Sequence, residues 1–224
     1  MIRIVVNGIS GKMGSTLYKA LKEKGEFEIV AGISRQELDL GIKIYDTLES
    51  CLLKEEFDTL VDFTIYPNCL DVVKLALNHQ KNVVSGTTGY KKYDGQQIEY
   101  LAKKNDVGVI ISPNFSLVDQ AFENFLRECK KQYPYVYLSE SHGIHKLDKP
   151  SGTAVYLAKV LEIEHENVFS LRIPGIIASH TLIFSDLDQR IEVTHAINSR
   201  DAFIKGIEDA IRHVTEEKRI NLMI

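Results

Sequence analysis

Several features that define specialised classes of protein are missing from this sequence. No apolar run approaches the roughly 20 residues that cross a membrane. The opening residues, MIRIVVNG, lack the long apolar region and the cleavage site of a signal peptide. Cys51, Cys69 and Cys129 are odd in number and scattered, without a metal-type spacing, which suits free thiols in a reducing compartment. We therefore expect a cytoplasmic protein without a membrane partner.

The sequence also lacks any block of lysine and arginine, or a basic stripe interleaved with aromatic residues. Its net charge is -4. The electrostatic footprint of a nucleic-acid-binding protein is therefore missing, and a small-molecule partner is expected. A hydrophobic content of 44% in 224 residues can build the core of one large domain or two small ones.

The first half of the chain alternates short β-type runs with amphipathic helical segments near residues 13–21 and 72–76. This alternation is typical of βαβ units that form a parallel sheet. The predicted strands cover residues 3–7, 28–33, 59–63, 82–85 and 108–111. The fold class predicted for this half is α/β, a Rossmann-type doubly wound parallel sheet.

The pattern changes after Asn114. Helices are predicted at 120–131, from about 153 and at 201–213, and strands at 136–141, 169–172, 181–184 and 190–197. We expect an α+β domain over residues 116–205, with a mixed or antiparallel sheet. Residues 1–115 and a returning segment, 206–224, are expected to form the first domain. Since no long linker separates the two, we expect a shared interface and a ligand cleft there.

A glycine-rich turn, GISGKMG at residues 8–14, follows the first predicted strand and opens a helix. Glycine lets a backbone approach a pyrophosphate, whose charge is bound by the free N–H groups and positive dipole of a helix N-terminus. The spacing is G-x-x-G-x-x-G rather than G-x-G-x-x-G, and such a turn can be purely structural. Its place after the first strand of a βαβ chain favours dinucleotide binding.

The end of the second predicted strand bears on the choice of nucleotide. NAD-specific sites place an acidic residue there, about 20 residues beyond the glycine turn. This sequence has Ser34 and Arg35 instead, and Lys12 adds a second cation in the turn. Arginine can pair with a 2′-phosphate, so the pattern predicts that NADPH is preferred over NADH. The alternative is that Arg35 is simply a solvated residue at the end of a strand.

The segment ESHGIHKLDKPSGTA, residues 140–154, carries the densest chemistry in the chain. His142 and Lys146 could supply a proton donor and an anion anchor to one small acid. Ser151, Gly152 and Thr153 are typical of a helix N-terminus that offers hydroxyl and N–H groups to a carboxylate. The alternative is that Ser151 merely caps a helix and that the histidine lies on the surface. No metal site is predicted, because no carboxylate or cysteine spacing completes a ligand set.

Other polar residues have structural interpretations. Asp62 ends a predicted strand, where it could act directly or only hydrogen-bond a neighbouring turn. His180 and His195 are expected to be satisfied histidines of a sheet or an interface. Arg172 and Arg200 are expected to brace the second domain or its subunit contacts.

Taken in order, these motifs resemble those of one family, the dihydrodipicolinate (4-hydroxy-tetrahydrodipicolinate) reductases, along nearly the whole chain. Besides the glycine turn and the 140–154 segment, the matching stretches are VDFT at 61–64, GTTG at 86–89, PNFS at 113–116 and IEVTH at 191–195. Single matching residues are Arg172, Gly175, His180, Phe184, Arg200, Phe203 and Gly206.

The resemblance implies NAD(P)H-dependent reduction of a cyclic dicarboxylate in lysine and diaminopimelate biosynthesis, usually by a homotetramer. It implies that residues 1–115 with 206–224 form a dinucleotide-binding domain and that residues 116–205 form a substrate-binding and oligomerisation domain. For the cofactor it implies contacts from Gly8, Ile9, Ser10, Gly11, Lys12, Met13, Ser34 and Arg35, and around the nicotinamide from Gly86, Thr87, Thr88, Ser112, Pro113, Asn114 and Phe115. It implies that His142 is a proton donor or acceptor and that Lys146 is a second donor and carboxylate contact. For the substrate it further implies contacts from Thr88, Ser151, Gly152 and Thr153.

Two departures from the family pattern keep alternatives open. Gly143 stands where a second histidine is usual, and Val118 where a glycine is usual. One alternative is an oxidoreductase for another small amino or imino dicarboxylate, such as an aspartate-type dehydrogenase, but the 140–154 segment favours the dipicolinate reaction. The other is a non-catalytic nucleotide sensor, against which the retention of His142 and Lys146 argues.

Overall fold

The computed structural model describes residues 1–116 and 120–224, so Val118 lies outside the described residues. The chain divides into two compact units, one formed by Met1–Phe115 with Phe203–Ile224 and the other by Ser116–Ala202. The sequence prediction put the second boundary between residues 205 and 206. Phe203 and Ile204 pack into the core of the first unit, which is why they belong to it.

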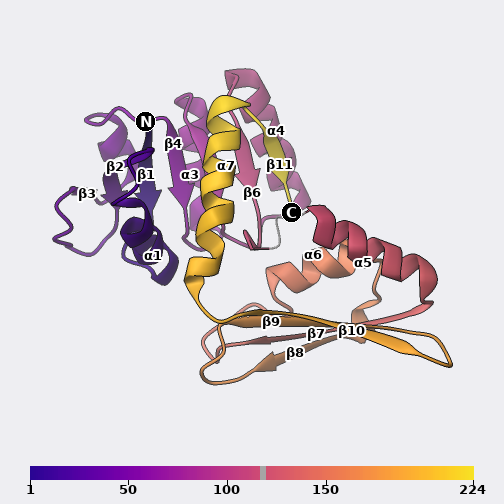
Figure 1. Cartoon of the computed structure of the whole chain (residues 1–224). Coiled ribbons are helices and arrows are strands. Elements are labelled where there is room, and N and C mark those ends of the chain that lie inside the picture. Colours follow the sequence, from indigo (N-terminus) through magenta and orange to yellow (C-terminus); the bar gives the residue numbers. More distant parts are fainter. Residues whose placement is uncertain (117–119) are drawn as a thin grey trace. The chain divides into compact units, whose positions relative to one another are not determined.

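The first unit is built on a sheet of seven parallel strands (Figure 1). They are β1 (Ile2–Asn7), β2 (Phe27–Ile33), β3 (Lys43–Tyr45), β4 (Thr59–Asp62), β5 (Asn82–Ser85), β6 (Val109–Ile111) and β11 (Ile220–Leu222). Their order in the sheet is β11-β6-β5-β4-β1-β2-β3. The central strands are nearly continuous apolar runs because both faces of a parallel sheet are covered. The prediction of a doubly wound α/β unit is confirmed.

Helices cover both faces of this sheet (Figure 1). On one face, α2 (Leu48–Leu52), α3 (Asn68–Asn78) and α4 (Lys92–Asn105) form a core with residues such as Val5. On the other, α1 (Lys12–Leu21) and α7 (Ile204–Glu216) pack against Ile4 and Val6. Neighbouring residues of β1 thus enter opposite cores, as the alternation of side chains along a strand requires.

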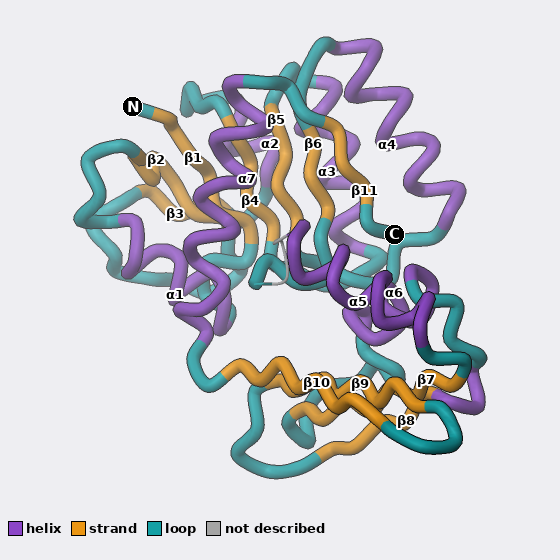
Figure 2. The backbone as a smooth tube through the Cα atoms, turned by 45° about the vertical axis from the view of Figure 1, so that its right-hand side comes forward, coloured by secondary structure: helices purple, strands orange, loops and turns teal. Residues whose placement is uncertain are grey.

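The second unit is a mixed four-stranded sheet with helices on one face (Figure 2). Its strands are β7 (Tyr135–His142), β8 (Val168–Arg172), β9 (Ala178–Ser185) and β10 (Arg190–Ile197), in the order β10-β9-β7-β8. Within this sheet β7 and β8 pair in parallel, and the other two strand pairs are antiparallel. The helices α5 (Gln120–Gln132) and α6 (Gly152–Val160) pack on one face, and η1 (His165–Asn167) precedes β8. The prediction of an α+β unit is confirmed.

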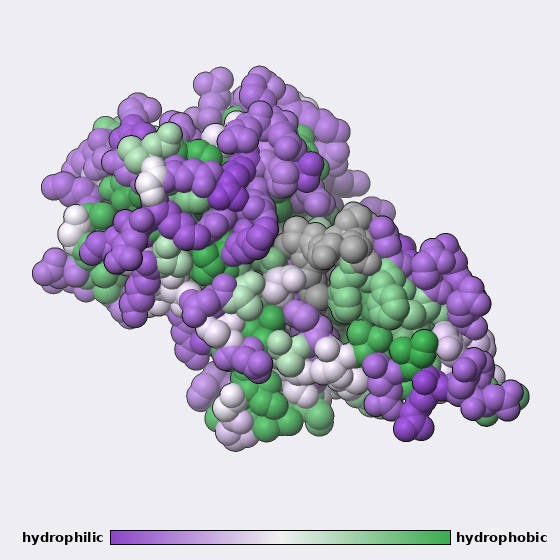
Figure 3. Space-filling view, in the orientation of Figure 1, coloured by the Kyte–Doolittle hydropathy of each residue, from purple (hydrophilic) through white to green (hydrophobic). Residues whose placement is uncertain are grey.

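The opposite face of this second sheet carries large apolar side chains. Tyr135 and Phe169 are 51% and 53% exposed, and Tyr137 and Leu171 are exposed as well. Figure 3 shows hydrophobic residues at the surface of the second unit. A length and hydropathy suited to crossing a bilayer is found in none of the helices within the described ranges.

Candidate active site

The residues predicted to hold the cofactor follow the strands of the first unit. In a parallel sheet the carboxyl ends of the strands lie along one edge, and ligands bind where the strand order reverses. Here the chain runs from β1 outward to β3 and then crosses to β4 on the other side of β1. The loops that follow β1 and β4 therefore flank the reversal point.

The glycine turn is shaped by close backbone approaches. Gly8 has φ +79°, and a Cβ there would lie 2.8 Å from the carbonyl oxygen of Phe63. At Gly14 a Cβ would lie 2.3 Å from the carbonyl oxygen of Gly8. Helix α1 begins at Lys12 with no side chain capping its N-terminus. The turn thus has the form that a dinucleotide fingerprint requires, with the first helical turn left for an anion.

The end of β2 is joined to this turn by a hydrogen bond. The buried Ser34 hydroxyl donates to Ser10 Oγ at 3.0 Å. Arg35 and Lys12 are exposed. Ile9 is 1% exposed and packs against Gly32, so only its backbone is left to face a ligand.

Beneath these loops lies a buried carboxylate. Asp62, at the end of β4, is 0% exposed and accepts four hydrogen bonds of 2.7 to 2.9 Å. The donors are Asn7, Thr64, Ser85 and Thr87. Burial raises the pKa of Asp62, although all four bonds act in the opposite direction. Asp62 ties the ends of three strands together, and it turns the Thr87 hydroxyl inward.

The residues predicted around the nicotinamide come together at the same edge. The Phe63 ring lies against Gly86, where a Cβ would be 2.2 Å from the ring, and meets the Phe115 ring edge-on at 6.2 Å. The buried Ser112 hydroxyl donates to the carbonyl oxygen of Asn114 at 3.1 Å. Thr88 and Pro113 are half-buried.

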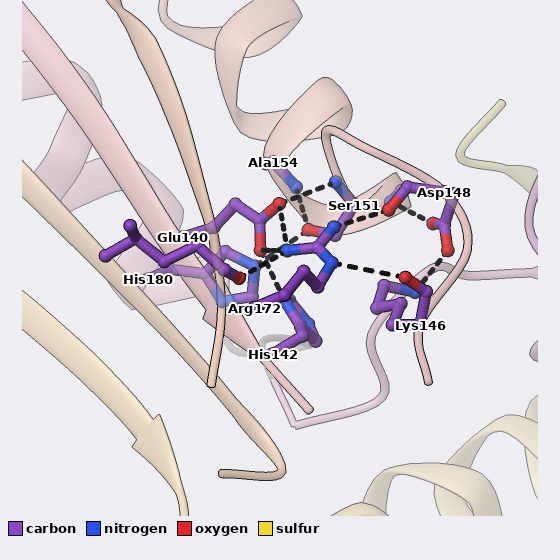
Figure 4. Close-up of polar contacts among 10 residues, drawn as sticks. Glu140, His142, Lys146, Asp148, Ser151, Ala154, Arg172 and His180 are labelled. Carbon is purple, nitrogen blue, oxygen red and sulfur yellow. Dashed lines mark hydrogen bonds and ion pairs between the residues drawn. The ribbon is translucent and has the colours of Figure 1, made fainter. Parts of the chain in front are cut away.

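In the second unit, His142 is the last residue of β7 and contacts a buried carboxylate (Figure 4). Its Nδ1 lies 2.5 Å from Glu140 Oε2. The guanidinium of Arg172, on β8, donates to both Glu140 oxygens at 3.0 Å. The backbone N–H of Ser151 donates to Oε1 at 3.2 Å. Since a buried glutamate is rarely found without a partner, these contacts explain why Glu140 can be 0% exposed.

The pKa values follow from these contacts. Burial alone would raise the pKa of Glu140, but the hydrogen bonds from His142 and Arg172 oppose it and the pKa is lowered. Burial lowers the pKa of His142, and the charges of Lys146 and Arg172 lower it further, against the opposing effect of Glu140. Glu140 is therefore an ionised acceptor, and unliganded His142 is predominantly neutral at pH 7.

The Lys146 loop and the start of α6 are linked through Asp148. Lys146 Nζ lies 2.8 Å from Asp148 Oδ1, and the N–H of Gly152 donates to Asp148 Oδ2 at 3.2 Å. The Ser151 hydroxyl accepts the N–H of Ala154 and contacts His180 Nε2, both at 3.2 Å. The prediction that a helix begins after Ser151 is confirmed, and Ser151 does cap it.

His180 and His195 lie on β9 and β10. The His180 ring meets the His142 ring edge-on at 5.3 Å, and burial together with the charge of His142 lowers the pKa of His180 to about 3. His145 is exposed. Within the described ranges, no group of three or more His, Cys, Asp or Glu is placed to hold a metal ion.

Two residues of this cluster were not assigned a role in the site from the sequence. From the sequence, Glu140 is only the first residue of the 140–154 segment, and Arg172 is expected only to brace the second domain or its subunit contacts. A signal for Glu140 existed, because it occupies a core-facing position of β7, in series with Val136 and Leu138. A glutamate in such a series requires a cationic partner. Nothing in the spacing identified Arg172, which lies 32 residues further along the chain.

Fold and site together define a class of protein: a two-unit oxidoreductase with a dinucleotide-binding Rossmann unit and a mixed-sheet unit that carries a histidine and a lysine. The family model described as "Dihydrodipicolinate reductase, N-terminus" matches residues 2–115, and "Dihydrodipicolinate reductase, C-terminus" matches residues 115–223. The chain belongs to the dihydrodipicolinate reductase family, whose members are NAD(P)H-dependent reductases. The resemblance seen in the sequence is confirmed.

Individual relatives agree with this membership. The 4-hydroxy-tetrahydrodipicolinate reductase of Methanocaldococcus jannaschii is 31% identical, over 97% of this chain and 94% of the relative. That of Dehalococcoides mccartyi is 30% identical with the same coverage. A dipicolinate-bound dihydrodipicolinate reductase from Paenisporosarcina sp. TG-14 is 26% identical, with a TM-score of 0.81 and coverage of 99% and 97% of the two chains. An aspartate dehydrogenase from Thermotoga maritima is 13% identical, with a TM-score of 0.59 and coverage of 97% and 98%, and shares the fold alone.

Proposed function

We propose that this chain reduces the cyclic dicarboxylate 4-hydroxy-tetrahydrodipicolinate, or dihydrodipicolinate, to tetrahydrodipicolinate in lysine and diaminopimelate biosynthesis. The observation that carries the proposal is the cluster in which His142, Lys146 and the start of α6 are gathered around Glu140 and Arg172. It unites a titratable imidazole, an ammonium group and helix N-terminal N–H groups, which suit a dianionic substrate that must gain a proton.

The first unit fits a nicotinamide nucleotide. The close approaches at Gly8 and Gly14 leave no room for side chains, and the uncapped N-terminus of α1 suits a pyrophosphate. The residues proposed to hold the nucleotide are Gly8, Ile9, Ser10, Gly11, Lys12, Met13, Ser34, Arg35, Gly86, Thr87, Thr88, Ser112, Pro113, Asn114 and Phe115. When bound, the nicotinamide would supply a hydride. The Thr87 hydroxyl is bonded to Asp62 and the Ile9 side chain is buried. These two residues would therefore contact the nucleotide mainly through backbone atoms.

NADPH is the preferred nucleotide in this proposal. Arg35 is exposed at the end of β2, where NAD-specific sites carry an acid, and the exposed Lys12 adds charge in the turn. Catalytic efficiencies measured with both nucleotides test this directly. A ratio that favours NADH, or a ratio unchanged in Arg35→Ala, contradicts it.

The second unit would bind the substrate and protonate it. The hydroxyl group of the 4-hydroxy form would leave as water to give the unsaturated dihydro ring. Addition of hydride to that ring, which is conjugated with an imine, leaves an enamine-like carbon that must gain a proton. We assign that proton to His142 and assign one carboxylate to Lys146, Ser151, Gly152 and Thr153. The substrate's two negative charges would raise the pKa of His142, so that the imidazolium forms when substrate binds. The family resemblance also implies a substrate contact from Thr88.

We further propose a homotetramer that works in the cytoplasm. The exposed row of Tyr135, Tyr137, Phe169 and Leu171 on the second sheet is the apolar surface that an assembly between copies would bury. Light scattering coupled to size exclusion tests the oligomeric state. A monomer at micromolar concentration, or a tetramer unaffected by charged substitutions at Tyr137 and Phe169, contradicts this assignment.

The decisive assay supplies the product of the preceding synthase with NADPH or NADH and follows the loss of reduced-nucleotide absorbance. We expect turnover that falls by about 10²-fold or more in His142→Gln and Lys146→Ala, while NADPH binding is unchanged. Turnover unaffected by both substitutions refutes the assigned roles. Nucleotide binding without turnover favours a sensor, and turnover only with another small imino dicarboxylate favours the alternative oxidoreductase.

A further inference from the structure

We propose that the ion pair between the buried Glu140 and the partly buried Arg172 positions His142 relative to the Lys146 loop and the start of α6, the two groups assigned to the substrate carboxylate. This inference rests on the proposed function, because the substrate contacts are those assigned there. It adds two positioning residues that do not themselves touch the substrate. All of these groups lie within the second unit (Figure 4).

The first step concerns the proton on His142. Glu140 is ionised and can only accept, so the contact of 2.5 Å to His142 Nδ1 is made by an Nδ1–H that donates. The neutral ring therefore keeps its lone pair on Nε2. Glu140 thus decides which nitrogen exchanges a proton with the substrate, and it stabilises the imidazolium when that forms.

The second step concerns the substrate cradle. The oxygen of Glu140 that does not contact His142 accepts the N–H of Ser151, next to the Gly152 N–H that we assign to the substrate carboxylate. One side chain therefore contacts both the proton donor and the start of α6. Both Glu140 oxygens are occupied within the protein and the side chain is 0% exposed, so Glu140 acts through its neighbours.

The third step concerns the Lys146 loop. Arg172 Nη1 holds Glu140, while Nε donates to the carbonyl oxygen of Lys146 at 3.2 Å and Nη2 donates to that of Asp148 at 2.5 Å. One planar guanidinium therefore fixes the backbone on both sides of residue 147. A lysine could not make these three contacts in one plane. The pair thus connects His142, the Lys146 loop and the start of α6.

The test is Glu140→Gln in the full-length protein. A glutamine presents an amide N–H₂ where two acceptor oxygens are needed, so it opposes either the Nδ1–H of His142 or the N–H groups of Arg172. We expect kcat to fall about 10²-fold or more, with NADPH affinity unchanged. We also expect the pH limb of kcat/KM that reports His142 to move to lower pH, because the imidazolium loses its acceptor. Loss of stability alone would not move that limb.

Glu123→Gln is the matched control. Glu123, on α5 in the same unit, accepts two hydrogen bonds from Arg127, at 3.0 and 2.8 Å, and one from Tyr156, at 2.7 Å. We expect it to leave kcat and the pH limb unchanged. Arg172→Lys should keep the charge and fold but raise KM, because the Lys146 loop loses its fixed backbone contacts.

The outcomes separate this inference from the proposed function. A wild-type chain without turnover refutes the proposed function. A wild-type chain that turns over, with Glu140→Gln retaining its kcat and pH limb, overturns the inference alone. If Glu140→Gln does not fold, ¹⁵N NMR of histidine-labelled wild-type protein decides, with His142→Gln used to assign the signal. An Nδ1–H tautomer at His142 supports the inference, and an Nε2–H tautomer overturns it.

Discussion

Substituting Gly14 with alanine sets two known effects against each other. Gly14 is the third residue of α1, where alanine normally stabilises a helix over glycine by about 0.5 to 1 kcal/mol. A Cβ at this position would lie 2.3 Å from the carbonyl oxygen of Gly8 and 2.7 Å from the Cα of Ile9. Real Cβ contacts stay above 3.0 Å, so the turn and the helix must separate by at least the difference, 0.7 Å.

The clash decides the sign, because both opposing atoms belong to the backbone and cannot rotate away. Overpacking of this kind costs about 1 to 3 kcal/mol, which exceeds the gain in helix propensity. We expect Gly14→Ala to lower the free energy of unfolding by roughly 1 to 2 kcal/mol. We also expect NADPH affinity to fall at least about 10-fold, equivalent to about 1.4 kcal/mol, since the displaced turn is the proposed pyrophosphate cradle.

Two other glycines make the comparison quantitative. At Gly11 a Cβ would lie 3.1 Å from the same Gly8 oxygen, and at Gly25 nothing lies within 4 Å. The loss of stability should therefore be largest for Gly14→Ala, smaller for Gly11→Ala and smallest for Gly25→Ala, which should lie within about 0.5 kcal/mol of wild type. Urea unfolding followed by circular dichroism measures stability in a chain without tryptophan, and a nucleotide titration measures affinity. A Gly14→Ala protein as stable and as tightly binding as wild type refutes the reasoning.

Three further predictions follow from the polar contacts. Burial lowers the pKa of His142 below its usual 6.5, and a dianionic substrate should raise it again. As the pH rises, kcat/KM should therefore fall with a lower apparent pKa than kcat does. Equal apparent pKa values in the two pH profiles would contradict this. Asp148 pairs with Lys146 at 2.8 Å and so should compete with a substrate carboxylate for the ammonium group. Asp148→Asn should therefore lower KM about 2- to 5-fold, which corresponds to the free energy of a part-exposed ion pair. A higher KM would instead mean that Asp148 helps to hold the substrate. Asp62→Ala leaves four donors, three of them buried, without their carboxylate acceptor and should cost about 3 kcal/mol or more in urea unfolding. Asp188→Ala, on an exposed turn, should leave the unfolding midpoint unchanged.

Most of the first unit could be predicted because its central strands are apolar runs bounded by glycine and other turn residues. The strands that were missed, β3 and β11, are three residues long and lie at the two edges of the sheet, where no residue of either is fully buried. Helix α4 was missed because few of its 14 residues are apolar and buried, which leaves little helical periodicity to read. Each of these elements is stabilised mainly by contacts with neighbouring elements, and its own sequence shows little helical or strand periodicity.

The substrate unit shows a different limit. His142, Lys146 and the start of α6 lie within 12 residues of one another and could be found from one segment. Arg172 could not, because its contact with Glu140 depends on the parallel pairing of β7 with β8, in which His142 lies opposite Arg172. That register is set by the fold of the whole unit. Local sequence therefore identifies the groups that would act, and strand pairing supplies the residue that holds them.

Gly143, like Arg172, can be interpreted from its contacts in the folded unit. The resemblance leads one to expect a second histidine at this position, and its absence kept a non-catalytic sensor open. A Cβ at residue 143 would lie 3.0 Å from the carbonyl oxygen of Ile176, in the connection between β8 and β9, so any side chain there is tightly opposed by backbone. Glycine thus accommodates a close approach by the segment that follows Arg172, and the loss of the imidazole is coupled to the local packing of the chain. The contacts of Glu140 with His142, Arg172 and Ser151 involve no side chain at position 143. The departure at Gly143 therefore leaves His142, the proposed proton donor, and its contacts with Glu140 in place, which favours an active reductase over a sensor.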